Sequence, residues 1–210
     1  MELKLYSMIL CYVCILTASA TLEYVSVGSY NISFDLENVI SDYSIEILAE
    51  NETNERYDGS TYIQNAVSIR GQGFFNDSTT DYSLIIINRD ETPWYVDSDS
   101  IISDIESMID RFGYYDVETY SRSIDGYDTF LGVGNSPWKQ TLYYTIYYPN
   151  CCQDGDYCIG NTKVAILSLQ SWDLVAPLLR TIHVELPDIE EIDEEILSPT
   201  NDPNSTAVLS

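Results

Sequence analysis

The stretch "SDSIISDIESMIDRFG", residues 98–113, decides the fold class, because a helical pattern here interrupts a chain that otherwise alternates as strands do. Its large apolar residues recur at the spacing of one helix face, namely Ile101, Ile102, Ile105, Met108, Ile109 and Phe112. Residues that cap helices precede them (Ser98, Asp99 and Ser100), and Gly113 stands where a helix stops. The pattern predicts a helix over residues 100–112 that packs one face against a sheet.

Strand patterns lie on both sides of this helix. Apolar and polar residues alternate, or apolar residues form short runs, at residues 29–36, 43–50, 81–89, 139–148 and 162–170. Residues 115–134 predict two further strands that turn at Asp125-Gly126, a dipeptide suited to the positive φ angles of a tight hairpin.

A second helix is predicted over residues 173–184. Asp173 can cap it, Pro177 lies near its first turn, and its apolar residues face the sheet (Leu174, Leu178 and Ile182). The element order is strands, helix, antiparallel strands, helix. This order predicts an α+β domain, in which an antiparallel β-sheet is covered by helices.

The N-terminus predicts export. Lys4 precedes an apolar run over residues 5–16, and Ala18-Ser19-Ala20 forms a signal-peptidase site. We therefore expect residues 1–20 to be a signal peptide and the mature chain to begin at Thr21. The alternative, a membrane anchor, would need roughly 20 apolar residues, more than this run offers. The expected location is secreted, in the extracellular space or at the cell surface.

The remaining chain divides by composition. Residues 21–186 have the length of one domain. Residues 187–210 concentrate acids, then Pro, Asn, Ser and Thr, and we expect a disordered acidic C-terminal tail. Four sequons could accept N-glycans on the way out of the cell, at Asn31, Asn51, Asn76 and Asn204.

The charge excludes two classes of partner. The chain has 34 acidic against 9 basic residues and a net charge of -25. Nucleic-acid binding requires clustered Lys and Arg, so no nucleic acid is expected as a partner. The same charge opposes docking on an anionic membrane.

Five local motifs occur in order along the domain: "VGSYNISFDL", "YSIEIL", "RFGYYDVE", "SIDGYDTF" and "APLLRTIHVEL". Together with the element order they resemble the PsbP-like domains of secreted archaeal and bacterial proteins, over about residues 24–186. The resemblance implies a PsbP-like α/β/α sandwich. It also implies a binding or assembly module, the usual role of that fold.

The loop "NCCQDGDYCIG", residues 150–160, holds three of the five cysteines. Adjacent cysteines do not match the thiolate spacing of zinc sites, and an exported chain favours a disulfide. A two-residue turn at Asp154-Gly155 would pair Cys151 with Cys158 and leave Cys152 as a free thiol. A three-residue turn would pair Cys152 with Cys158 instead. Asp-Gly favours the first pairing.

Catalytic signatures are missing from the sequence. The single histidine, His183, is predicted on the last helix beside apolar neighbours, where an exposed or structural imidazole is expected. We therefore expect no enzyme, no catalytic or metal-binding residues and no cofactor. A Ca²⁺ site stays open, because aspartates that could supply oxygens cluster twice, at Asp97, Asp99 and Asp104 and at Asp154 and Asp156. Helix caps and turns explain the same residues.

Tyrosines point to a binding surface. The segment "LYYTIYY" places Tyr143 and Tyr147 on one face of a strand and Tyr144 and Tyr148 on the other. Tyr143, Tyr147 and Trp138 could form an aromatic patch, although ordinary sheet packing explains the same pattern. The predicted function is a secreted, non-catalytic binding or cell-surface interaction module for an unknown protein, glycan or small ligand. The alternative is a small extracellular hydrolase or metal-dependent enzyme that uses carboxylates.

Overall fold

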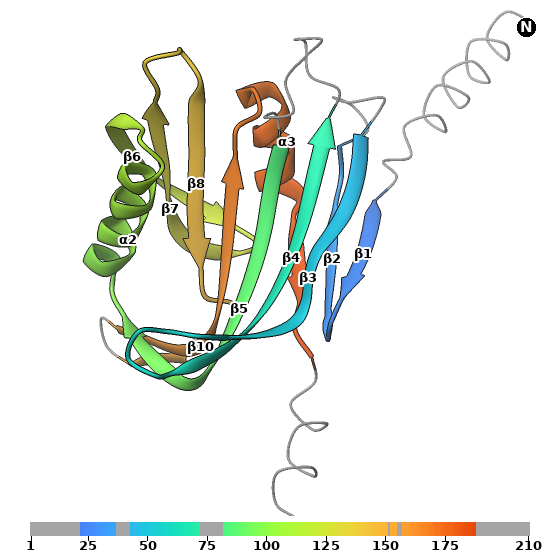
Figure 1. Cartoon of the computed structure of the whole chain (residues 1–210), viewed down its shortest axis with the longest axis vertical. Coiled ribbons are helices and arrows are strands. Elements are labelled where there is room, and N and C mark those ends of the chain that lie inside the picture. The colour runs from blue at the N-terminus through green and yellow to red at the C-terminus, as the bar shows by residue number, and fades with distance from the viewer. Residues whose placement is uncertain (1–21, 37–42, 72–81, 151, 155–156, 188–210) are drawn as a thin grey trace, which may run out of the picture.

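Strands dominate the computed structural model, which describes residues 22–36, 43–71, 82–150, 152–154 and 157–187 (Figure 1). An eight-stranded antiparallel sheet has the order β3-β4-β5-β10-β8-β7-β6, and β9 pairs with β10 beside this path. Its strands are β3 Tyr43–Glu55, β4 Thr61–Gly71, β5 Tyr82–Val96, β6 Tyr115–Ile124, β7 Tyr127–Asn135, β8 Thr141–Tyr147, β9 Cys152–Asp154 and β10 Tyr157–Ser168. All strand segments predicted from the sequence are confirmed, and the long strands extend beyond the predicted bounds.

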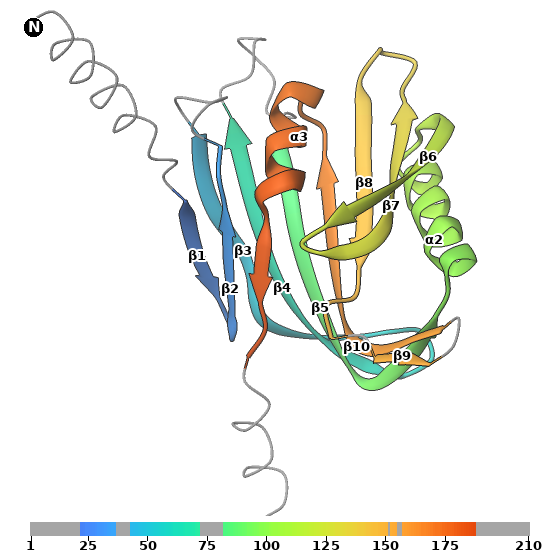
Figure 2. The same ribbon diagram turned by 180° about the vertical axis from the view of Figure 1, so that it is seen from behind.

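A second, three-stranded antiparallel sheet covers one face of the large sheet. It has the order β1-β2-β11, with β1 Glu23–Val27, β2 Tyr30–Phe34 and β11 His183–Glu185. Figure 2 shows this sheet and helix α3, Trp172–Thr181, in front of the large sheet. Their apolar residues form one core with the facing side chains of β4, β5 and β10, including Val67, Ile85 and Ile166.

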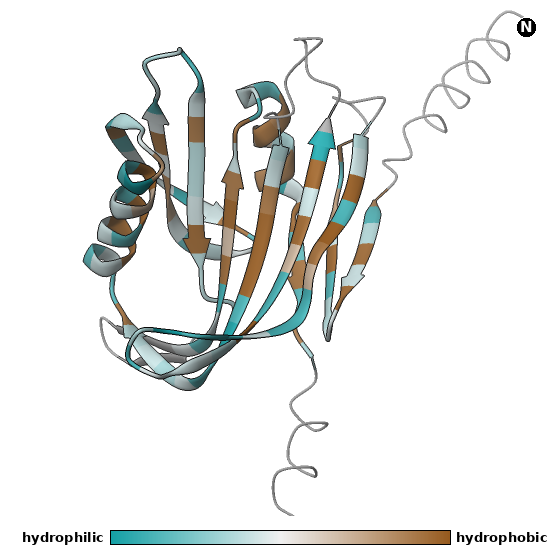
Figure 3. Ribbon diagram, in the orientation of Figure 1, coloured by the Kyte–Doolittle hydropathy of each residue, from teal (hydrophilic) through white to brown (hydrophobic). Residues whose placement is uncertain are grey.

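The other face carries helix α2, Ser98–Arg111. Its Ile105 and Ile109 are fully buried in a second core with Leu142, Tyr144 and Leu167. The central strands β5 and β10 contribute to both cores, which explains their continuous apolar sequence and the brown band through the middle of the sheet in Figure 3.

The expected fold class is therefore wrong. The sequence predicted an α+β antiparallel sheet covered by helices, in a PsbP-like α/β/α sandwich, whereas the described residues are mostly β, with two helices and two antiparallel sheets. The reason is that β1, β2 and β11 pair with one another and not with the large sheet. Alternation in sequence identifies a strand, but it does not say which sheet the strand joins.

Two glycines let α2 approach the sheet closely. An added Cβ at Gly132 would lie 2.3 Å from Ile105 Cγ2, and one at Gly134 would lie 2.3 Å from Ile109 Cγ2. Both glycines belong to β7, directly beneath the helix. The helix thus fills the space that side chains on this face of β7 would otherwise occupy.

The local signals at turns and caps are largely confirmed. Asp125 and Gly126 adopt φ angles of 54° and 80° at the β6–β7 hairpin, as a tight turn with two positive φ angles requires. Helix α2 is capped one residue earlier than expected, by Asp97, whose carboxylate accepts a hydrogen bond of 2.7 Å from the Ser100 amide. The hydrogen bonds from the Ser100 hydroxyl and from its amide lower the pKa of Asp97.

Helix α3 differs from its prediction at both ends. Ser171 occupies the N-cap position in place of Asp173, so Pro177 lies within the helix and not in its first turn. The helix ends at Thr181, and residues 183–185 form β11, in which His183 pairs with Ser33 of β2. Beyond the helix, the backbone of β11 pairs with β2.

Candidate ligand-binding pocket

The β3–β4 hairpin forms one wall of a pocket. Register shifts between Ile47 and Ala49 and between Ala49 and Glu52 interrupt its pairing, and such bulges bend a strand. In Figure 1 the far end of the hairpin curls across the bottom of the sheet toward the side that carries α2. The turn is closed by two backbone hydrogen bonds, from the Arg56 amide to the Ser60 carbonyl and from the Gly59 amide to the Arg56 carbonyl, and Gly59 adopts a φ of 85°.

Helix α2 forms the opposite wall, and the sheet forms the floor. Asp104, Met108 and Arg111 lie at i, i+4 and i+7, so they share one face of the helix beside its buried face. The cavity has a volume of about 650 Å³. The remaining lining residues come from the hairpin turn and from β4, β5, β10 and the end of β8, namely Glu55, Arg56, Asp58, Ser60, Tyr62, Asn88, Asp90, Thr92, Trp94, Tyr148 and Lys163.

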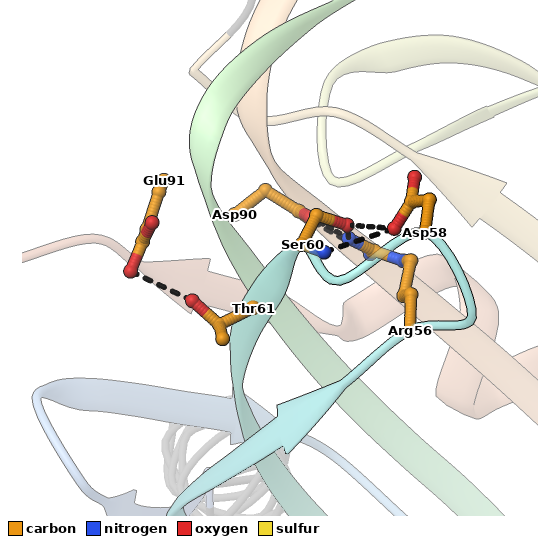
Figure 4. A network of polar contacts seen from close by, with 6 residues as sticks. All are labelled: Arg56, Asp58, Ser60, Thr61, Asp90 and Glu91. Atoms are coloured by element: carbon orange, nitrogen blue, oxygen red, sulfur yellow. Dashed lines mark hydrogen bonds and ion pairs between the residues drawn. The ribbon is translucent and has the colours of Figure 1, made fainter.

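An ion pair between Arg56 and Asp90 lies on the side of the pocket that the β3–β4 hairpin forms (Figure 4). The two guanidinium Nη atoms donate to the two carboxylate oxygens of Asp90, one of them over 2.9 Å. Asp90 is 3% exposed, and Arg56 is the basic partner of its buried carboxylate. The hydrogen bond to Asp90 is also the main reason why the pKa of Arg56 is raised. The guanidinium lies 4.5 Å above the ring of Tyr62 and 5.8 Å from that of Trp94.

Neighbouring polar groups hold the hairpin turn in place. Asp58 accepts hydrogen bonds from the Ser60 amide over 3.0 Å and from the Ser60 hydroxyl over 2.7 Å. These bonds lower the pKa of Asp58. Thr61 donates to Glu91 over 2.7 Å, which ties β4 to β5 beside the turn (Figure 4).

A second ion pair joins the floor to α2. Lys163 of β10 donates to the carboxylate of Asp104. Tyr148 lies next to it, with its ring edge-on to Trp94 at a centroid distance of 5.9 Å. Burial raises the pKa of Tyr148, and the negative charges of Asp104 and Asp90 raise it further. The pocket therefore combines an aromatic corner, formed by Trp94 and Tyr148, with two ion pairs, Arg56–Asp90 and Lys163–Asp104.

The pocket gathers basic residues that are scarce elsewhere. Arg56, Arg111 and Lys163 are three of only nine Lys and Arg residues in the chain. They face four carboxylates of the lining, at Glu55, Asp58, Asp90 and Asp104. The described lining contains neither histidine nor cysteine, and in the described part of the chain no group of three His, Cys, Asp or Glu side chains could hold a metal ion.

Two of the aspartates considered for Ca²⁺ have other partners. Asp97 caps α2, and Asp104 pairs with Lys163. Asp156 lies outside the described residues, as does the side chain of Asp154.

The residues of the expected aromatic patch lie in three different environments. Tyr147 is 1% exposed, stacks on Tyr127 at 5.6 Å and donates to Asp125 over 3.1 Å. Tyr143 is half-buried against Trp172, with ring centroids 5.4 Å apart. Trp138 is 88% exposed in the turn between β7 and β8. The alternation of tyrosines along β8 is confirmed, but this face of the strand packs on the core.

Two of the four sequons lie in the described residues. Asn31 is exposed on β2, where its amide donates to Glu185 over 3.1 Å, and Asn51 is exposed at a φ of 51° in β3. Asn76 and Asn204 lie outside the described residues. Glycosylation of each stays a prediction.

The cysteine loop has a register that differs from both expected alternatives. Cys158 pairs with Gln153 and Ile159 with Cys152, since Asp154 pairs with Tyr157. In the alternative that places Cys151 opposite Cys158, Tyr157 would lie opposite Cys152. In the structure Tyr157 lies opposite Asp154. Cys151 lies outside the described residues, as do the side chains of Cys152 and Cys158. The Cys151–Cys158 disulfide and the free thiol at Cys152 stay predictions.

His183 belongs to β11 and not to a helix, contrary to the prediction. Its Nδ1 lies 2.6 Å from Asp125 Oδ1 at the tip of the β6–β7 hairpin. The Asp125 carboxylate, 4% exposed, also accepts from the Tyr147 hydroxyl and, over 2.9 Å, from the Val184 amide. The cluster fastens the hairpin to the small sheet. It lies outside the pocket lining.

The sequence singled out Asp104, Met108 and Tyr148 for other reasons, but it did not indicate the pocket or the rest of its lining. Arg56, Asp90 and Lys163 are far apart in the chain and belong to no motif. The one signal that could have drawn attention to them is the scarcity of basic residues in a strongly acidic chain.

No protein-family model, curated protein or solved structure matches this chain. The resemblance to PsbP-like domains thus rests only on the local motifs and the element order read from the sequence. Among the described residues, no helix is long and apolar enough to cross a membrane.

Proposed function

We propose that this chain is a secreted, non-catalytic binding module that holds its ligand in the pocket between α2 and the β3–β4 hairpin. The observation that carries the proposal is the Arg56–Asp90 pair, whose carboxylate is buried, beside the aromatic corner of Trp94 and Tyr148. A buried ion pair is an inefficient way to stabilise a fold, because apolar residues of similar volume do so at least as well. Its position in a pocket of ligand size favours a role in recognition.

The charge arrangement favours binding over catalysis. Asp90 and Asp104 are each neutralised by a basic partner. A general acid or base must reach the substrate with its carboxylate, and these two carboxylates are occupied by the guanidinium of Arg56 and the ammonium of Lys163. The N-terminal apolar run and its small-residue site support secretion, and we expect the exported protein to begin at Thr21.

One observation favours the alternative, a small extracellular hydrolase. In His183 and Asp125 a buried carboxylate orients an exposed imidazole, the arrangement by which a hydrolytic base is commonly held. The pair lies outside the pocket lining, and Asp125 is already engaged by Tyr147 and Val184. We therefore infer that it fastens the hairpin to β11.

Assays for turnover test the proposal against this alternative. The purified protein is incubated with chromogenic esters, glycosides and peptides, beside His183→Ala, Asp104→Asn and an Arg122→Ala control on the exposed β6 strand. We expect no turnover by any of them. Hydrolysis that His183→Ala or Asp104→Asn abolishes and Arg122→Ala retains would overturn the proposal in favour of an enzyme.

A further inference from the structure

The pocket's charges determine which ligands it can accept. Arg56 is paired with Asp90, and Lys163 is paired with Asp104. An anionic ligand would meet the carboxylates of a lining that holds four acids against three bases, in a chain of net charge -25. For a cationic ligand, the two carboxylates at the centre of the pocket, Asp90 and Asp104, are already paired with Arg56 and Lys163. A neutral ligand competes with neither pair.

The same groups retain hydrogen-bonding capacity for a neutral ligand. A guanidinium has five N–H donors, and a carboxylate can accept about four hydrogen bonds. Asn88 accepts from Gln64 through its Oδ1 over 3.3 Å, which leaves its amide N–H groups as donors. The hydroxyls of Thr92 and Tyr148 add further donors and acceptors to the lining. Fixed, planar polar groups of this kind match pairs of neighbouring hydroxyls on a ligand.

The aromatic corner supplies an apolar surface beside these groups. Tyr62 is covered by the guanidinium of Arg56, and Tyr148 meets Trp94 edge-on. Trp94 is half-buried and offers the broadest ring of the lining. Sugar rings present a C–H face that packs on such a ring while their hydroxyls bind planar polar side chains.

We infer that the pocket binds a neutral saccharide, with Trp94 as the stacking platform, Arg56 and Asn88 as hydrogen-bonding groups, and the buried Asp90 holding Arg56 in position. The cavity of about 650 Å³ accommodates more than one sugar unit, so a short oligosaccharide fits. This inference rests on the proposed function, because it names the ligand class of the same pocket.

Titration calorimetry with neutral oligosaccharides tests the inference. The panel contains gluco-, manno- and N-acetylglucosamine oligomers of two to four units, with uronic-acid and glucosamine oligomers as charged counterparts. We expect a neutral oligomer to bind, Trp94→Leu to weaken that binding at least tenfold, and Trp138→Leu to leave it unchanged. Trp138 is the matched control because it is highly exposed and lies outside the pocket.

A variant with Trp94 as its single tryptophan keeps the test independent of how Trp94→Leu folds. The exposed Trp138 and Trp172 are replaced by Phe, and the bound sugar should shift the emission of Trp94. Binding of the charged oligomers alone, or of neutral ones without a change in Trp94 emission, would overturn the inference. If only a peptide or other non-sugar ligand binds and shifts Trp94 emission, the saccharide inference fails while the proposed binding function stands. If no member of any class binds, both fail.

Discussion

Gly132 and Gly134 of β7 determine how closely α2 approaches the sheet. Neither has a positive φ, so both are present for space and not for backbone conformation. Close packing of this kind leaves no room for one added methyl group, since protein interiors are filled to the density of organic crystals.

Replacement of Gly132 by alanine should destabilise the domain by about 1–3 kcal/mol, because the new methyl group would overlap Ile105. Chemical denaturation of the purified variant measures the effect. The double variant Gly132→Ala/Ile105→Ala is the control, because it removes Ile105 Cγ2, the nearer of the two atoms that the methyl group would overlap, and leaves Ile109 Cδ1. The two changes should cost less together than the sum of their separate effects. Strict additivity would show that α2 does not press on β7 at this point.

Arg56 shows how burial changes the value of an ion pair. Its partner Asp90 is almost fully buried, whereas Arg70 and Glu46 form an exposed pair at 3.5 Å on neighbouring strands of the same hairpin.

Arg56→Ala should therefore cost about 2–3 kcal/mol, somewhat below the 3–5 kcal/mol of a fully buried pair, because Arg56 keeps 35% of its side chain exposed. The matched change Arg70→Ala should cost less than about 1 kcal/mol. Urea unfolding of both variants gives the comparison. Equal effects would mean that Asp90 is stabilised by something other than Arg56.

The β6–β7 hairpin and β11 are joined through one carboxylate. Asp125 combines a turn conformation with a φ of 54° and three hydrogen-bond partners on β8 and around β11. The large and the small sheet are thereby linked at the hairpin tip.

Asp125→Ala should lower the free energy of unfolding by about 1–3 kcal/mol, since it leaves the Tyr147 hydroxyl and the Val184 amide without their acceptor. Hydrogen exchange at Val184 should accelerate more than at residues of β10. Asp125→Asn is the control, because asparagine tolerates a positive φ and keeps one acceptor oxygen. Unchanged exchange at Val184 in the alanine variant would contradict the link.

Helix α2 is held on the sheet by its Ile105–Ile109 face. Ile105→Asp would bury an unpaired charge and should cost several kcal/mol, enough to threaten a domain that is stabilised by about 5–15 kcal/mol in total. Ser107→Asp, on the exposed side of the same helix, is the control for the added charge. Thermal unfolding by circular dichroism should separate the two variants clearly. A variant Ile105→Asp that melts with the wild type would show that this face does not pack as described.

The protein as a whole is rich in tyrosine, and several of its tyrosines are buried. Burial raises the pKa of Tyr144 and Tyr148 and raises that of Tyr147 well above the usual value. In the folded state these tyrosines hold their protons more tightly than in the unfolded chain. The free energy by which the neutral tyrosines favour the folded state is fully present below about pH 10, where the tyrosines of the unfolded chain titrate. It is lost progressively as the pH rises above that value toward the folded pKa.

We therefore expect the protein to unfold in alkali, with the buried tyrosines ionising only as it does so. Absorbance of tyrosinate, followed together with circular dichroism, should show exposed tyrosines titrating near pH 10 and a second, cooperative step at the unfolding transition. The double variant Tyr144→Phe/Tyr148→Phe should shrink that second step. Smooth titration of all tyrosines below the unfolding pH would contradict the burial described here.

Short-range features of this protein follow from its sequence alone. The helical spacing at residues 98–113, the alternation along the strands and the Asp125-Gly126 turn each depend on neighbours within a few residues, so they could be predicted. The stabilities of a cap or a tight turn are set by the backbone and by adjacent side chains.

The tertiary structure decided what depends on partners distant in the chain. Three features require segments up to about 150 residues apart to be brought together. They are the sheet that β1, β2 and β11 join, the burial of Tyr147, and the pairing of Arg56 with Asp90. A strand pattern is compatible with many pairing partners, and the sequence around a charged residue does not indicate which opposite charge it will meet. Packing between the two sheets and α2 selects among these alternatives, because it alone determines which side chains lose contact with water.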